Sequence, residues 1–135
     1  MNPDYLFNRD FFYFSGMDIK IEKGDRYTTI RVLVEKLNSQ IAPLLKSEMI
    51  LVTGEGESNI ILDVSACSFC DSAGLSTILV GNRLCKNSNG VFVIAGVQEG
   101  VERLINISQA DKFLNIVYRV DKADDKMNSL LDKKE

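Results

Sequence analysis

The pattern of apolar and polar positions changes several times along this chain, and its first regular stretch predicts a β-hairpin. Ile19 and Ile21 alternate with polar residues, and alternation returns in residues 27–34. Gly24 and Asp25 separate the two stretches and favour a turn. We therefore expect two antiparallel strands in this part of the chain.

Helical spacing follows the predicted hairpin. Asn38 and Ser39 offer an N-cap, and Pro43 is tolerated because it falls in or near the first turn. Residues 54–57, Gly-Glu-Gly-Glu, then end the helix as a turn. The apolar stripe of this predicted helix comprises Ile41, Leu44, Leu45 and Leu51.

From residue 60 onward, strands and helices alternate. Apolar runs predict strands at residues 60–64, 91–95 and 114–120. Helical spacing occupies residues 72–86, 97–107 and 123–131. The predicted fold class is α/β: a hairpin and then alternating helices and strands, giving a mixed, mostly parallel sheet of about five strands covered by about four helices.

Residues 1–16 differ from the rest because six of the chain's eleven aromatic residues, seven Phe and four Tyr, lie within the first fourteen positions. They follow neither the strand nor the helix period. Two interpretations stay open: the segment docks on the domain or on a partner, or Met17 is the natural start and the segment is an extension that is poorly ordered or not native. The expected division is an extension over residues 1–16 and one domain over residues 17–135.

Composition narrows the function. The chain has 135 residues, a net charge of −3 and no histidine. The missing histidine excludes Ser-His-Asp and Cys-His catalysis and histidine-based zinc sites. The acidic balance argues against nucleic acid or an anionic membrane as partner. Without an apolar run of membrane-spanning length or a basic signal peptide, we expect a cytoplasmic protein, and three cysteines fit a reducing compartment.

Cys67 and Cys70 form a Cys-x-x-Cys spacing between a predicted strand and a helix, which is where a dithiol oxidoreductase keeps its redox pair. Against that function, the helix begins after Cys70, so neither thiol lies in its first turn. Alternation places Cys67 and Phe69 on one face and Cys70 on the other. The favoured interpretation is that both cysteines are small apolar core residues.

The junction Asp71-Ser72-Ala73-Gly74-Leu75 is the most informative motif. Asp71 or Ser72 is expected to cap the following helix. A hydroxyl at this position is also exposed at the carboxyl end of a parallel strand, where open α/β sheets place their sites. A phosphate on Ser72 would change a docking surface strongly and the fold little. Ser76, one turn later, is a weaker second acceptor.

The segments Ile61-Leu62-Asp63-Val64-Ser65 and Phe69-Cys70-Asp71-Ser72-Ala73-Gly74-Leu75 together resemble the signature of the sulfate transporter and anti-sigma factor antagonist (STAS) domain family. The similarity is strongest to the stand-alone anti-sigma factor antagonists. It implies a non-enzymatic module, with no cofactor or metal, that binds an anti-sigma factor serine/threonine kinase and thereby regulates transcription. Phosphorylation by that kinase would end the binding, and a phosphatase would restore it.

Carried over to this chain, the resemblance implies a phosphorylation switch at Ser72. Together with the spacing of the following helix, the resemblance implies that the partner contacts Asp71, Ser72, Ala73, Gly74, Ser76 and Asn38. Gly74 would permit close approach of the partner. The family's Gly-Glu-Leu-Asp loop is Glu35-Lys36-Leu37-Asn38 here, which changes the charges on the partner surface. Two alternatives stay open: a STAS subunit of a signalling scaffold or lipid-transport complex, and a Cys67/Cys70 dithiol oxidoreductase.

Overall fold

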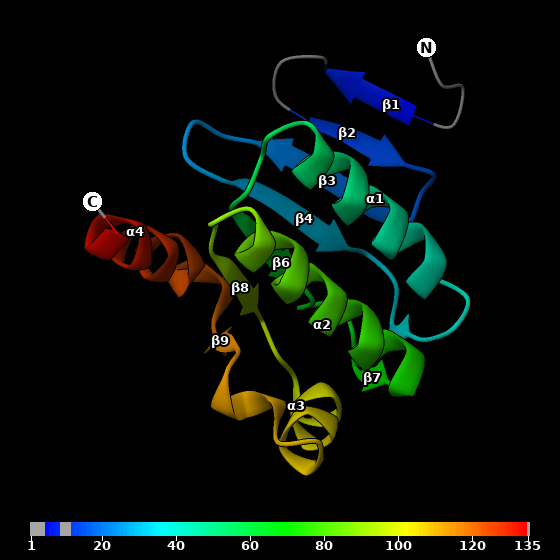
Figure 1. The fold of residues 1–135 in the computed structure, drawn as a ribbon. Coiled ribbons are helices and arrows are strands. Elements are labelled where there is room, and N and C mark those ends of the chain that lie inside the picture. The colour runs from blue at the N-terminus through cyan, green and yellow to red at the C-terminus, as the bar shows by residue number, and fades with distance from the viewer. Residues whose placement is uncertain (1–4, 9–11, 135) are drawn as a thin grey trace.

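The structure, a computed structural model, describes residues 5–8 and 12–134 and is built on a seven-stranded sheet (Figure 1). The strand order is β1-β2-β3-β4-β6-β8-β9. From β1 to β4 each strand is antiparallel to its neighbour, whereas β4, β6, β8 and β9 run parallel. The strands span Tyr5–Asn8 (β1), Phe12–Ser15 (β2), Ile19–Lys23 (β3), Thr28–Val32 (β4), Ile60–Asp63 (β6), Phe92–Ala95 (β8) and Asn115–Val117 (β9).

A second sheet of two short parallel strands lies apart from the first. It pairs β5 (Lys36–Leu37) with β7 (Phe69–Cys70). Strand β7 directly precedes the second helix, so this small sheet holds the segment that leads into that helix. Residue alternation did not indicate it, because two residues are too few to show a period.

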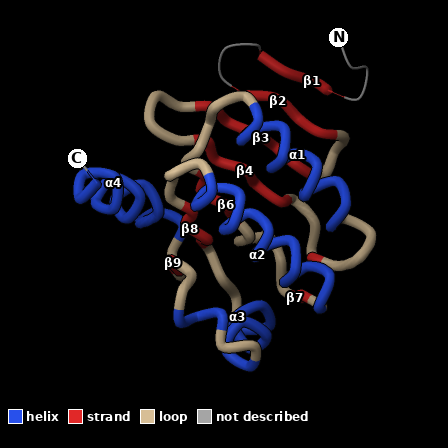
Figure 2. The backbone as a smooth tube through the Cα atoms, viewed as in Figure 1, coloured by secondary structure: helices blue, strands red, loops and turns tan. Residues whose placement is uncertain are grey.

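Helices cover both faces of the main sheet. Helices α1 (Ala42–Gly54) and α2 (Ser72–Asn87) lie side by side across one face, and α4 (Ala123–Lys134) lies against the other (Figures 1 and 2). Helix α3 (Glu99–Ile107) sits near β7, and short 3-10 turns span Ala110–Lys112 and Val120–Lys122. The larger core lies between the sheet and α1 and α2, and a smaller one joins Ile61 and Val93 to Met127 and Leu131 of α4.

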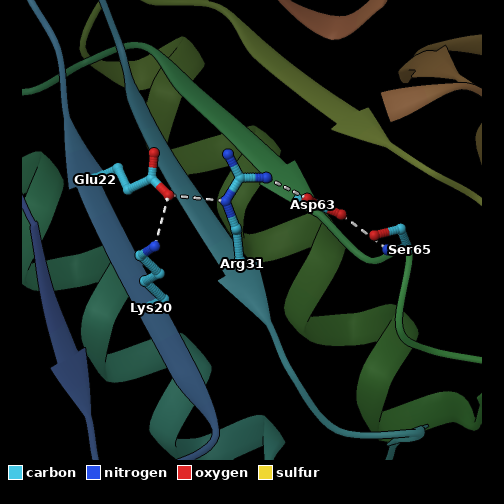
Figure 3. A network of polar contacts seen from close by, with 5 residues as sticks. All are labelled: Lys20, Glu22, Arg31, Asp63 and Ser65. Carbon is cyan, nitrogen blue, oxygen red and sulfur yellow. Dashed lines mark hydrogen bonds and ion pairs between the residues drawn. The ribbon is translucent and has the colours of Figure 1, made fainter. Parts of the chain in front are cut away.

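The part of the sheet that α4 leaves uncovered carries a chain of polar contacts (Figure 3). Arg31 on β4 donates to Glu22 on β3 at 2.9 Å and to Asp63 on β6 at 2.6 Å. The hydrogen bond from Arg31 lowers the pKa of Glu22. Lys20 also pairs with Glu22, and Asp63 accepts from the backbone N–H of Ser65. The network ties three strands together and fixes the chain where it leaves β6.

The predicted α/β fold is confirmed. Strands β3, β4, β6, β8 and β9 and four helices match the expectation, including the hairpin and the helix-strand alternation. The aromatic N-terminal segment adds two further strands, although its apolar spacing predicted neither strand nor helix. The last strand is shorter than expected: it ends at Val117, a bend at residues 118–119 follows, and a 3-10 turn begins at Val120 before α4.

Two predictions about the first helix were wrong. Neither Asn38 nor Ser39 caps the helix: its N-cap residue is Ile41, which has no side-chain cap. The side-chain oxygen of Asn38 instead accepts from the Gln40 N–H inside the preceding turn. Leu51 is half exposed, since the buried face runs through Ala42, Leu45, Met49 and Val52. Pro43 lies in the first turn as expected. Among the described residues, no helix combines the length and apolarity needed to cross a membrane.

Candidate functional site

The N-terminus of α2 forms the centre of the candidate site. Asp71 is the N-cap residue in extended conformation, and its side chain accepts a hydrogen bond of 2.9 Å from the N–H of Gly74. This arrangement settles which of the two predicted residues caps the helix and leaves Ser72 as its first residue. Ser72 is exposed. Its hydroxyl is therefore available for chemistry without any change in the fold.

The segment before α2 is held by a segment more than thirty residues earlier in the chain. The N–H groups of Ser68 and Phe69 donate to the carbonyl oxygen of Glu35 at 2.9 and 3.3 Å, and Asp71 donates to the carbonyl oxygen of Leu37 at 3.2 Å. The Ser68 hydroxyl also donates to the carboxylate of Glu35 at 3.1 Å. These bonds, together with the pairing of β5 and β7, place Asn38 next to the cap of α2.

The predicted contact residues differ in how accessible they are. Ser72 and Ser76 are exposed, and Asp71, Ala73 and Asn38 are partly buried. The structure thus brings five of the six predicted residues to one end of the molecule, where a partner can reach them.

Gly74 is the exception, because it is buried inside the protein. A Cβ atom at this position would overlap the Leu37 carbonyl oxygen and come within 2.9 Å of the Cys70 Sγ. The prediction that Gly74 gives a partner room to approach is therefore wrong. Its missing side chain lets α2 press against β5, which is an internal packing requirement.

The charges around the site are mixed. Glu35, Lys36 and Asn38 line a shallow hollow beside β5, together with Asp18, Val34, Gln40 and Ile41. Asp71 adds a carboxylate next to Ser72. The first backbone N–H groups of α2 carry partial positive charge, which stabilises an anion bound there. A phosphate on Ser72 would be supported by the helix and repelled by Asp71.

The three cysteines are free and buried. Burial raises the pKa of Cys67 to about 12 and that of Cys70 to about 11, with the nearby Asp71 carboxylate also raising the latter. Thiols with such pKa values stay protonated near neutral pH and are poor nucleophiles. This supports the core interpretation over dithiol catalysis. Cys67 lies in the turn after β6, so it does not share a face with Phe69 as alternation had suggested.

Phe69 is a residue of the site that sequence reasoning used only as part of a motif. It lies on β7 and its side chain is 48% exposed, whereas the neighbouring Cys70 faces the core. The signal was present in the chain, since a buried Cys70 in an extended segment requires its neighbour to point outward. Among the described residues, no group of three or more Cys, Asp or Glu side chains is arranged to hold a metal ion.

Comparison with known proteins gives the same fold. The STAS domain family model matches residues 18–123. A solved anti-sigma factor antagonist from Mycobacterium paratuberculosis is 20% identical, with a TM-score of 0.72 over 82% of this chain and 92% of that one. The anti-sigma factor antagonist SpoIIAA in its unphosphorylated form is 18% identical, with a TM-score of 0.70 over 82% and 96%. A chain of the stressosome, described as a signal integration and transduction hub, is 24% identical, with a TM-score of 0.67 over 82% and 97%.

Proposed function

This chain belongs to the STAS domain family, and we propose that it acts as an anti-sigma factor antagonist whose binding to a serine kinase is switched by a phosphate on Ser72. The observation that carries the proposal is the position of Ser72, an exposed hydroxyl in the first turn of α2, directly after the capping carboxylate. Similarity to SpoIIAA, whose structure is that of an unphosphorylated form, supports it.

In the unmodified state, the surface formed by the α2 N-terminus and the Glu35–Asn38 segment binds the kinase and keeps it from its sigma factor. The kinase supplies ATP, magnesium and the catalytic base, so this chain needs to provide only the acceptor. The Ser72 Oγ bonds to the γ-phosphorus of ATP as the bond to the bridging oxygen breaks. ADP leaves, and the hydroxyl proton passes to the kinase.

The phosphate then acts locally. It brings a charge of about −2 to a surface that already holds the carboxylate of Asp71, so a partner surface that accommodated a neutral hydroxyl is repelled. Since the helix N-terminus stabilises the added anion, the fold is retained and the change stays confined to the docking surface. Hydrolysis of the phosphate by a phosphatase returns the binding-competent form. The protein would serve transcriptional regulation in the cytoplasm.

The test is phosphorylation in vitro by the serine kinase of the anti-sigma factor class encoded nearest to this chain. Incubation with the kinase and ATP should add one phosphate, which intact-mass and fragment spectra place on Ser72. Ser72→Ala should take up no phosphate, and the matched variant Ser129→Ala, at an exposed serine of α4, should behave as wild type. Full phosphorylation of Ser72→Ala would exclude Ser72 as the switch.

A second candidate function is a subunit of a signalling scaffold, which the similarity to a stressosome chain favours. A scaffold subunit forms a large stable assembly with other STAS proteins, and its assembly does not depend on Ser72 phosphate. Size-exclusion chromatography of the chain mixed with its kinase separates the two functions. An antagonist and its kinase elute as a small complex that dissociates when ATP is added. A scaffold subunit elutes as a large assembly whose size does not change with ATP.

A further inference from the structure

The side chain of Phe69 is a large, half-exposed apolar group close in the chain to Ser72, the proposed phosphorylation site. It lies three residues before Ser72 and is 48% exposed, although it belongs to a paired strand. Burying an exposed aromatic side chain is strongly favourable, and such residues dominate the free energy of protein interfaces. A single exposed aromatic is common on protein surfaces, so the meaning of Phe69 depends on how it is held.

The backbone of Phe69 is fixed from three directions. On one side it pairs with Lys36 of β5 and donates to the Glu35 carbonyl oxygen. On another, α3 packs so closely that a Cβ on Gly100 would overlap the Ser68 carbonyl oxygen. After Phe69, the chain enters the capped first turn of α2. Because this backbone is already ordered, a partner that covers the ring orders no further backbone, and an aromatic side chain has only two rotatable bonds to fix.

We propose that Phe69 is the apolar anchor of the kinase-binding surface and inserts into an apolar pocket on the kinase that docks at Ser72. This inference rests on the proposed function and adds the chemistry that its partner must provide. The polar rim of the anchor is formed by Ser68 and Glu35, whose side chains bond to each other at 3.1 Å. An apolar centre with a polar rim is the usual arrangement of a protein interface.

The anchor also explains how one phosphate can release the partner. Phe69 and Ser72 are joined by a short, rigid segment, so the ring cannot shift to keep its pocket when the phosphorylated Ser72 pushes the kinase away. The affinity that Phe69 provides is lost together with the contacts at Ser72. A flexible anchor would allow the partner to stay attached through the ring alone.

The experiment measures binding of the same kinase to wild type, Phe69→Ala, Phe69→Leu and Phe113→Ala by calorimetry without ATP. Phe113 is the matched control, because it is an aromatic residue 50% exposed and placed after the 3-10 turn that follows α3. We expect Phe69→Ala to raise the Kd by about 30-fold, Phe69→Leu by less and Phe113→Ala not at all. With ATP, Phe69→Ala should raise the KM for phosphorylation and leave kcat near that of wild type.

The possible failures are distinguishable. If the kinase does not bind the wild-type chain, the proposed function fails and the inference with it. If the kinase binds wild type and both Phe69 variants with the same Kd, only the proposal that Phe69 is the anchor is overturned. If Phe113→Ala loses as much affinity for the kinase as Phe69→Ala, the proposal is also overturned, since the effect would not be specific to Phe69. Urea unfolding of each variant shows whether the fold is intact, and Phe69→Leu keeps a large apolar side chain if Phe69→Ala is destabilised.

Discussion

The backbone N–H of Asp71 donates a hydrogen bond of 3.2 Å to the carbonyl oxygen of Leu37. This bond connects the cap of α2 to the segment that ends in Asn38, although the two are far apart in the sequence. Both parts of the proposed partner surface therefore belong to one rigid unit, held further by β5–β7 pairing. A change that separates the two segments should weaken partner binding even if Ser72 itself is untouched.

Gly74→Ala tests that connection. The new methyl group would overlap the Leu37 carbonyl oxygen, so α2 must move away from β5. Overpacking of this kind costs about 1–3 kcal/mol in the free energy of unfolding, measured with urea. The control is Gly54→Ala at the end of α1, where no atom lies within 4 Å of the added Cβ. Equal stability of the two variants would show that the close approach at Gly74 is not required.

Asp71→Ala separates the capping role of this residue from any contact with the kinase. Loss of the hydrogen bond to the Gly74 N–H should lower the free energy of unfolding by about 1 kcal/mol. Asp71→Ser restores a capping oxygen without the charge and should recover most of that stability. If Asp71→Ser is stable but binds the kinase as weakly as Asp71→Ala, the carboxylate contributes to binding directly. If Asp71→Ala has the same free energy of unfolding as wild type, the cap contributes nothing to the stability of the protein.

The buried thiols give a prediction about pH. Burial raises the pKa of Cys67 and Cys85 to about 12 and that of Cys70 to about 11, above the ordinary value of about 8.5. The folded state therefore favours protonated thiols. Below about pH 8.5 the thiols are protonated in both states, and the free energy of unfolding is unaffected by their ionisation. As the pH rises from there toward the pKa values of the folded state, the free energy of unfolding falls, because the thiols of the unfolded chain ionise first.

Thiol labelling measures directly how buried and unreactive these cysteines are in the native chain. At pH 8 a thiol-specific reagent should react far more slowly with the native chain than with the urea-unfolded chain. A dithiol oxidoreductase would behave in the opposite way, with a fast native reaction and a disulfide between Cys67 and Cys70 under mild oxidation. Fast native labelling of either residue would contradict the buried environment described for them.

The ion pair between Arg31 and Asp63 should matter more than a surface pair of the same length. Both Arg31–Asp63 and Arg119–Asp121 have a distance of 2.6 Å, but the Asp63 side chain is 7% exposed and that of Asp121 is 61% exposed. Since Arg31 keeps some solvent contact, Asp63→Ala should cost about 1–3 kcal/mol in unfolding free energy. Asp121→Ala should cost less than about 0.5 kcal/mol. Equal effects would show that burial does not decide the strength of this pair.

Most of the fold could be predicted from the sequence because its elements have clear periods. The strand runs at Ile60 and Phe92 and the helix starting at Ser72 are bounded by turn residues and lie close to their predicted positions. The site motif could be located for the same reason, since a capping residue at a strand-to-helix junction has a strong local signature.

What the sequence did not predict depends on distant contacts. The β5–β7 pair was missed because it consists of two residues from each strand, and the role of Gly74 depends on the position of Leu37. The exposure of Leu51 follows from the rotation of α1 against the sheet, which its apolar residues alone leave ambiguous. The sequence predicts that Asn38 caps the first helix, whereas its side-chain oxygen bonds to the Gln40 N–H in the preceding turn. That turn has no distinctive sequence pattern, so the bond could not be predicted.

The measurement that tests the central claim most directly is the affinity of the kinase for the unphosphorylated chain and for the same chain carrying one phosphate on Ser72. We predict that calorimetry without ATP gives a Kd about a hundredfold higher for the phosphorylated chain, with an unchanged circular dichroism spectrum. Ser72→Asp should bind weakly as well, and Ser72→Ala should bind like the unphosphorylated chain. Equal Kd values for the two phosphorylation states would contradict the switch.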